Sequence, residues 1–352
     1  MSTDFRRVKF LGILFPLFFL LHACSPEEAS DRKEANKTSE VGNINTVSGE
    51  ISTAEMGNTL IHEHLLVDFI GADSTGFHRW DREEVVSVVL PYLQEIKAQG
   101  VKTLFDCTPA FLGRDAVLLK MLADSSGLQI ITNTGYYGAA DNKYLPYNTY
   151  IENAATIAKR WTNEFTYGID SIDVKPGFIK IGVETGSLSG LHEKLIRAAA
   201  LTHLETGLTI ASHTLYAIPA FDQIAVLQSM GVSPEAFIWV HAQAEENKDK
   251  YIEAAKLGAW ISLDGLKDEN LNEYLLMLNK MKEADLLNKV LISHDAGWYS
   301  PGEENGGNFR SYSTLFGKFI PYLKKQGYTD EEVEQLVVKN PIEAFSIKVR
   351  KL

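Results

Sequence analysis

Eight short runs rich in β-branched and other apolar residues alternate with longer segments of helical period, and this alternation constrains the fold more than any other feature of the chain. In the segments 82–100 and 191–207, apolar residues recur three and four positions apart, and each segment ends in a glycine suited to a helix C-terminus. Strands that alternate with helices predict βα units and a parallel sheet. The eight runs are 59–66, 101–108, 128–135, 178–184, 208–214, 237–242, 260–265 and 290–295.

Eight βα units in a chain of 352 residues suit an α/β fold of the (β/α)₈ TIM-barrel type, whose usual length is ~250 residues. With 45% hydrophobic and 23% charged residues, the chain can bury a core of this size. We therefore expect a single barrel domain over 46–352, with its active site at the C-terminal strand ends. A doubly wound open sheet is the alternative, but no glycine-rich phosphate fingerprint follows the first strand to support it.

The first 24 residues have the pattern of an export signal. Basic residues precede the uncharged run FLGILFPLFFLL, whose 12 residues are too short to span ~30 Å of hydrocarbon as a helix. The following LHAC resembles a bacterial lipoprotein signal, which implies a signal peptide over 1–23 and lipid on Cys24 that anchors the protein to a membrane. Ser25 favours the outer membrane, on its periplasmic or surface face. An ordinary secretory peptide with a coincidental cysteine is the alternative.

Residues 24–45 are polar and charged without apolar periodicity, which is typical of a flexible tether. Cys107 is the only other cysteine, so no disulfide is expected within the mature domain. The formal net charge of −12, without a dense basic run, argues against a nucleic-acid partner and favours a small molecule. A homodimer remains an open alternative.

Two histidines, His62 and His64, lie two positions apart in the otherwise apolar first strand. Side chains at i and i+2 point to the same face, and in a barrel that face is the interior. A single strand histidine is more often a hydrogen-bonded core residue, but two near a strand end favour metal ligation.

Three further candidate ligands, His213, His241 and Asp295, each fall at the C-terminal end of a predicted strand. These strand ends converge on one mouth of a barrel. Imidazole and carboxylate ligands suit Zn²⁺, Fe²⁺ or Mn²⁺, and the absence of a thiolate from the set argues against a closed structural zinc site. The set therefore predicts a catalytic metal centre.

Lys180 in the fourth strand is the residue that barrel packing explains least, because burying an unpaired ammonium is costly. One hypothesis is a Schiff-base lysine, which needs a depressed pKa but no histidines. The other is carboxylation by CO₂ to a carbamate that bridges two cations. The four histidines favour the second hypothesis.

Taken in order, His62, His64, Lys180, His213, His241 and Asp295 resemble the ligand set of the phosphotriesterase family of the amidohydrolase superfamily. The likeness runs from about residue 44 to 345. It implies two divalent metals, with Zn as the first expectation and Mn, Fe or Co as alternatives. His62, His64 and Asp295 would hold one metal, His213 and His241 the other, and carboxylated Lys180 would bridge them together with a hydroxide.

The remaining site residues follow from this scheme. Asp295 is the expected catalytic general base, because it reaches both the metal and the nucleophile. Asp264 is expected to orient a ligand histidine such as His241, with a capping carboxylate as the alternative. Tyr137 and Trp298 are candidates for an apolar substrate pocket. The other histidines, at positions 78, 192, 203 and 294, are not assigned to metal, and Asp106 and Cys107 are expected in the core rather than in a thiol mechanism.

Gly265 is a departure from the family pattern, since lactonase-like members carry a larger cationic or imidazole side chain there. Either the pocket is wider, or Lys267 or Arg310 enters from a loop. The leading hypothesis is a binuclear hydrolase of carboxylic esters or lactones, with phosphotriester hydrolysis as runner-up and an amide as a further alternative. A lipid-anchored protein that binds metal or a small ligand without turnover is the alternative of another class.

Overall fold

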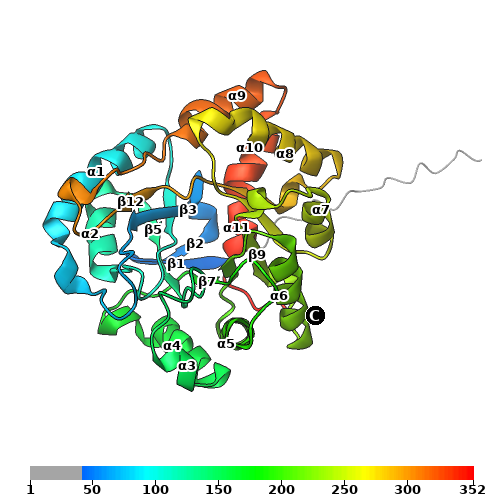
Figure 1. Ribbon diagram of the computed structural model, residues 1–352. Coiled ribbons are helices and arrows are strands. Elements are labelled where there is room, and N and C mark those ends of the chain that lie inside the picture. Colours follow the sequence, from blue (N-terminus) through cyan, green and yellow to red (C-terminus); the bar gives the residue numbers. More distant parts are fainter. Residues whose placement is uncertain (1–41) are drawn as a thin grey trace, which may run out of the picture. The chain divides into compact units, whose positions relative to one another are not determined.

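The structure of the protein, a computed structural model, describes residues 42–352 (Figure 1). The expected signal peptide, the lipidation site Cys24 and the tether as far as residue 41 lie outside the described residues. Within the described part, no helix combines the length and apolar character needed to cross a bilayer.

An antiparallel hairpin of β1 (Asn43–Thr46) and β2 (Gly49–Ser52) precedes the barrel strands. Ile44 in β1 is fully buried, and the backbone N–H of Val47 donates to Ile130 O at 2.9 Å. Residues 43–45 are therefore strand and not tether, because the apolar side chain of Ile44 packs into the core. The folded domain begins before residue 46, where it was expected to start.

All eight predicted strands are present and pair in parallel. The third is divided, because Thr132 separates a piece that pairs with the second strand from a piece that pairs with the fourth. The strands are β3 (Thr59–Leu66), β4 (Thr103–Asp106), β5 (Gln129–Ile131), β6 (Asn133–Thr134), β7 (Phe178–Gly182), β8 (Ile210–His213), β9 (Phe237–Val240), β10 (Trp260–Leu263) and β11 (Val290–Ile292).

The last strand returns to the first and closes the ring. The Asp295 backbone N–H donates to His62 O at 2.9 Å, and the His64 N–H donates to Ala296 O at 2.8 Å. A short strand β12 (Gly297–Tyr299) continues this pairing along β3. The fold is thus the expected (β/α)₈ barrel, and its seam lies at residues that were predicted to bind metal.

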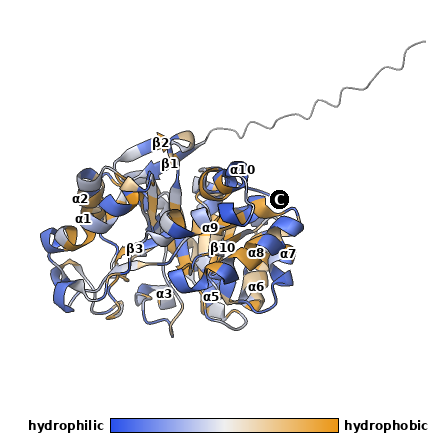
Figure 2. Ribbon diagram, turned by 90° about the horizontal axis from the view of Figure 1, so that it is seen from above, coloured by the Kyte–Doolittle hydropathy of each residue, from blue (hydrophilic) through white to orange (hydrophobic). Residues whose placement is uncertain are grey.

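Helices surround the strands on the outside of the barrel (Figure 1). Hydrophobic and hydrophilic residues alternate along helices such as α7 and α8 (Figure 2), as expected where one face packs on strands and the other meets water. The helices include α1 (Arg82–Ala98), α2 (Ala116–Ser126), α3 (Asn148–Ile151), α4 (Ala154–Tyr167), α5 (Gly190–Thr206), α6 (Ala217–Ser229), α7 (Asp249–Lys256), α8 (Leu271–Glu283), α9 (Ile320–Lys325), α10 (Asp330–Glu334) and α11 (Asn340–Phe345).

An aromatic cluster fills the barrel interior at the N-terminal half of the strands. The rings of Phe105 and Phe345 lie 4.2 Å apart, those of Phe105 and Phe178 5.5 Å apart, and Ile44 packs in the same cluster. Because apolar side chains occupy this end, the polar side chains of the interior are left at the C-terminal strand ends.

Candidate metal centre

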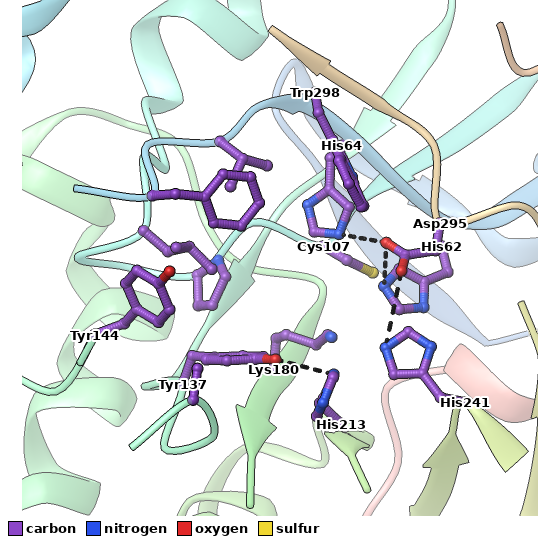
Figure 3. Close-up of a pocket in the computed structure, with 15 residues that line it drawn as sticks. His62, His64, Cys107, Tyr137, Tyr144, Lys180, His213, His241, Asp295 and Trp298 are labelled. Carbon is purple, nitrogen blue, oxygen red and sulfur yellow. Dashed lines mark hydrogen bonds and ion pairs between the residues drawn. The ribbon is translucent and has the colours of Figure 1, made fainter. Parts of the chain in front are cut away.

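The six predicted ligands come together at one cavity of about 210 Å³, at the C-terminal end of the barrel (Figure 3). Parallel strand ends place them there, because neighbouring strands present their last residues to the same mouth. His62 and His64 lie in β3, Lys180 in β7 and His213 at the end of β8, while His241 and Asp295 follow β9 and β11.

Thr108 orients the imidazole of His64. Its hydroxyl lies 2.8 Å from His64 Nδ1 and donates its proton to Leu66 O at 2.9 Å. Because a hydroxyl has one proton to give, it accepts from the Nδ1–H of His64. The Nε2 atom of His64 is therefore the one left to face the cavity.

Asp264 orients two histidines at once. Its Oδ1 accepts from His241 Nδ1 at 2.7 Å, and its Oδ2 lies 2.8 Å from His62 Nδ1. The expectation from sequence concerned one histidine, and the fully buried carboxylate reaches both. Such contacts set which ring nitrogen remains free for a metal.

Three imidazole Nε2 atoms are directed at the carboxylate of Asp295. The distances to its oxygens are 3.1 Å from His64, 3.6 Å from His62 and 3.9 Å from His241. The Nε2 of His62 is buried without a hydrogen-bond partner in the part of the chain that the structure describes. An orphaned nitrogen beside a carboxylate is the donor arrangement that a cation satisfies, so these residues fit a divalent metal.

The electrostatics at His62 and Asp295 agree with this fit. Burial and the nearby Lys180 lower the pKa of His62 to about 4, so its imidazole is neutral as a ligand requires. Burial would lower the pKa of His241 as well, but the Asp264 carboxylate raises it above its ordinary value. Burial would raise the pKa of Asp295, yet the surrounding histidines hold it well below the usual range, so this carboxylate is ionised.

Lys180 and His213 lie on the side of the cavity where Tyr137 is (Figure 3). Lys180 is 2% exposed, and within residues 42–352 its ammonium has no carboxylate partner. The Tyr137 hydroxyl lies 3.0 Å from His213 Nδ1, and burial with the neighbouring His241 and Lys180 lowers the pKa of His213. A buried ammonium without an anion is costly, which makes Lys180 the residue most in need of a chemical explanation.

Two of the candidate ligands have a strained backbone. His241 has φ 62° and Asp295 has φ 51°, both in the left-handed region that non-glycine residues rarely adopt. Strain of this kind persists where the surrounding contacts hold it, and it concentrates at functional sites. The sequence contains no signal for these conformations.

The rest of the cavity wall is mostly apolar and aromatic. Tyr137 and Trp298, both expected in the substrate pocket, line it, and the Phe69 and Trp298 rings lie 5.8 Å apart. Sequence analysis missed Phe69, because it lies in a loop whose spacing carries no periodic signal. Leu112 and Tyr144, which were also missed, complete the wall.

The space beside Gly265 is filled, contrary to the expectation of a wider pocket or an incoming Lys267 or Arg310. A side chain at Gly265 would meet Gln243 Nε2 at 2.8 Å. Lys267 is exposed and does not line the cavity. The Arg310 guanidinium lies 4.7 Å from the Trp298 ring centre, donates to the backbone carbonyl of His294 and does not line the cavity.

Two of the histidines left unassigned, His192 and His294, have other partners. His294 Nδ1 lies 2.6 Å from Glu63 Oε1, on the outer face of the barrel, and His192 Nε2 lies 2.9 Å from Gly138 O. Cys107 is buried at the cavity wall, where burial raises the pKa of its thiol. Burial also raises the pKa of Asp106 to about 6. No histidine lies within hydrogen-bonding distance of the thiol to activate it, as far as residues 42–352 show.

Comparisons with known proteins match almost the whole described domain. The chain is 29% identical over 293 residues to the phosphotriesterase homology protein of Escherichia coli, covering 82% of this chain and 98% of that protein. It is 28% identical over 310 residues to the aryldialkylphosphatase of Saccharolobus solfataricus, covering 84% and 97%.

A solved structure supports the same relationship. A mutant of the organophosphorus hydrolase from Deinococcus radiodurans superposes with a TM-score of 0.77 at 25% identity, covering 86% of this chain and 97% of that one. The model of the phosphotriesterase family matches residues 42–345. With its fold, its converging ligands and these relatives, the chain belongs to the phosphotriesterase family of hydrolases.

Proposed function

We propose that the protein is a binuclear metal-dependent hydrolase that cleaves a carboxylic ester or a lactone. The observation that carries this proposal is the convergence of three imidazole Nε2 atoms on Asp295, in a cavity that also holds the unpaired Lys180. A cavity with ligands on one side and apolar rings on the other can bind a neutral substrate against a metal.

The ligands divide into two groups. His62, His64 and Asp295 would hold one metal, and His213 with His241 the other. Lys180, carboxylated by CO₂, would bridge both metals. As an anionic carbamate it would be paired with two cations, whereas the buried ammonium has no carboxylate partner in the described part of the chain. When bound, two divalent cations, Zn first among the candidates, supply a Lewis acid for the substrate oxygen and acidify a water molecule.

The protein's own groups perform the remaining tasks. Asp295 lies at the centre of the ligand cluster, so it is the carboxylate placed to take the proton of the attacking water and pass it to the leaving group. Asp264 and Thr108 hold the imidazoles in place, which removes the need for them to reorganise during the reaction. The apolar wall excludes bulk water from the substrate.

The lining of the cavity favours a neutral substrate such as an ester or lactone. Apart from the candidate ligands, its side chains are mostly apolar or aromatic. Lys180 is the only Lys or Arg among the lining residues that the structure describes, and as a carbamate it would not be cationic, so an anionic group on the substrate away from the metals would find no cationic side chain. Phosphotriester hydrolysis remains the second candidate, because a relative is an aryldialkylphosphatase.

The cellular location is part of the same proposal. Lipid on Cys24 would hold the hydrolase at the outer membrane, with the residues after it as a spacer. This part rests on the LHAC motif alone. Incorporation of labelled palmitate, compared with the Cys24→Ala variant, tests it, and an unlabelled wild-type protein would exclude the anchor.

The first experiment is proton release at constant pH by residues 41–352, with Zn²⁺ or Mn²⁺ added. Lactones, aryl esters and phosphotriesters are offered side by side, with a chelator as the control. Amides are tested separately by assay of the released amine, because their hydrolysis near neutral pH gives a carboxylate and an ammonium and no net proton. We expect turnover of lactones or esters that the chelator abolishes. Faster phosphotriester turnover would favour the second candidate, and turnover of amides alone would reject ester specificity.

Two variants separate an enzyme from a binding protein. Lys180→Ala and Asp295→Asn both remove groups that serve the reaction, so an enzyme loses turnover in both. A binding protein without turnover would keep its ligand affinity in Asp295→Asn. Calorimetric titration of a slowly cleaved lactone into each variant distinguishes the two cases.

A further inference from the structure

Gln243 holds Asp264 by two hydrogen bonds. Its Oε1 accepts from the Asp264 backbone N–H at 3.1 Å, and its Nε2 donates to Asp264 Oδ1 at 3.2 Å. Gln243 lies in the short helix that begins directly after His241. It does not line the cavity, so its contacts are directed at the carboxylate and not at a substrate.

Asp264 is where the orientation of the imidazoles is set. Oδ1 accepts from the N–H of His241 at 3.1 Å and from its Nδ1 at 2.7 Å, while Oδ2 accepts from Ser262 Oγ at 2.8 Å and faces His62 Nδ1. Rotation of this carboxylate would move both imidazoles. The amide of Gln243, in the short helix after His241, is a further donor to the carboxylate and opposes such rotation.

Gly265 provides the space that Gln243 occupies. Its φ lies outside the left-handed region, so the backbone itself does not require glycine. A Cβ there would lie 2.8 Å from Gln243 Nε2 and 3.0 Å from the Tyr274 hydroxyl. Two hydrogen bonds hold the Gly265 backbone in place: its N–H donates to the Tyr274 hydroxyl at 2.6 Å, and its carbonyl accepts from Asn270 Nδ2 at 2.9 Å.

We propose that Gln243 is a positioning residue of the metal centre, acting through Asp264 on His241 and His62, and that Gly265 is what leaves room for it. The larger side chain expected at position 265 in lactonase-like relatives and the Gln243 amide are alternative occupants of one space in this chain. The inference rests on the proposed function, because that proposal supplies the metal. It explains why position 265 is glycine by a contact within the protein.

The first test compares Gln243→Leu with Gln129→Leu. Leucine keeps a similar volume without the two hydrogen bonds, and Gln129 is a matched control because its amide accepts from Thr103 Oγ1 at the N-terminal end of β5. We expect Gln243→Leu to bind Co²⁺ about 10 to 100-fold more weakly and to alter its visible absorption, as loss of an outer hydrogen bond does elsewhere. Gln129→Leu should match wild type in both.

Steady-state kinetics add a second readout. With saturating metal, Gln243→Leu should lower kcat and leave KM within about twofold, because Gln243 does not line the cavity. Unchanged cobalt affinity and spectrum in Gln243→Leu would overturn the positioning role.

A double-mutant cycle tests the role of Gly265. Gly265→Ala should weaken cobalt binding in the wild-type background, and it should do so less in the Gln243→Ala background, where the atom it would meet is gone. Equal effects in the two backgrounds would overturn the steric part of the proposal. If Gly265→Ala does not fold, folding of the double variant supports the coupling, and failure of both counts against it.

A metal-free measurement separates this inference from the proposed function. If wild type binds no divalent metal, the proposed function fails. The positioning role is then decided from the imidazole N–H resonances of His62 and His241 in the apoprotein, which report the hydrogen bonds to Asp264. Gln243→Leu must shift at least the His241 resonance while Gln129→Leu does not, and an unshifted resonance would reject the role.

Discussion

Thr108 accepts a hydrogen bond from His64: the hydroxyl lies 2.8 Å from Nδ1 and gives its own proton to Leu66 O. We therefore expect Thr108→Val to leave the Nδ1–H of His64 unsatisfied and its ring free to turn. Metal affinity should fall about 10 to 100-fold, and the free energy of unfolding should drop by about 1 to 3 kcal/mol. Thr108→Ser keeps the hydroxyl and should stay close to wild type in metal competition assays and urea unfolding. Equal losses in both variants would contradict the tautomer argument.

Asp264→Asn should disable two ligands with one substitution. An amide offers one acceptor oxygen and places N–H groups opposite either His62 or His241, whose Nδ1 atoms both face the carboxylate now. We expect metal affinity to fall by at least about tenfold, measured by competition with a chromophoric chelator. Asp268→Asn, in the exposed pair with Lys318, is the control and should have no effect. Wild-type affinity in Asp264→Asn would remove Asp264 from the centre.

Gly135→Ala should destabilise the fold, although Gly135 is not one of the candidate metal ligands. Gly135 has φ 127°, and a Cβ there would lie 2.1 Å from the backbone oxygen of Lys180. Strand β7 would have to move, which we expect to cost more than about 2 kcal/mol. Gly186→Ala meets no atom within 4 Å and has no such φ, so it should change stability by less than about 0.5 kcal/mol. Denaturant unfolding of both variants checks this, and similar values would refute it.

His203 makes stability depend on pH. Its Nδ1 lies 2.9 Å from Leu208 O and its Nε2 accepts from the Arg350 N–H at 2.9 Å, while burial and the Arg350 charge lower its pKa below 6.5. The unfolded state therefore binds the proton more readily, so the stabilisation is complete above pH 6.5 and is lost as pH falls towards the lower, folded pKa.

The comparison of wild type with His203→Gln isolates this contribution from the other titrating groups. Between pH 6.5 and 5, wild type should lose stability more steeply, by up to about 1.4 kcal/mol per pH unit. Parallel pH profiles of unfolding free energy for the two proteins would show that His203 does not titrate differently on folding.

The strands were predictable because their signal is local. The run 59–66 coincides with β3, and every other predicted run contains its strand. The third was predicted whole and is divided at Thr132, because β5 and β6 pair with different neighbours, which periodicity does not record. Residues 43–45 of β1 were assigned to the tether for a related reason: their only strong apolar signal is Ile44, whose burial depends on distant residues.

Within the site, local pattern located the six candidate ligands but not the groups that orient them. Thr108 lies 44 positions from His64, and Gln243 lies 21 positions before Asp264, so no spacing rule links the members of either pair. Gly265 shows the same limit, since the sequence reveals the missing side chain and only the packing reveals what takes its place.

The pairing of the first and last barrel strands determines when the metal site can assemble during folding. Asp295 and His62 are joined by the hydrogen bond that closes the ring, although 233 positions separate them (295 − 62). The loop-closure entropy of so distant a contact opposes its formation until the strands between have paired. No fragment that lacks the final strand can assemble the ligand cluster, so metal uptake during synthesis or refolding would report completion of the whole barrel. A chain that ends before the last strand would carry the histidines and yet lack Asp295.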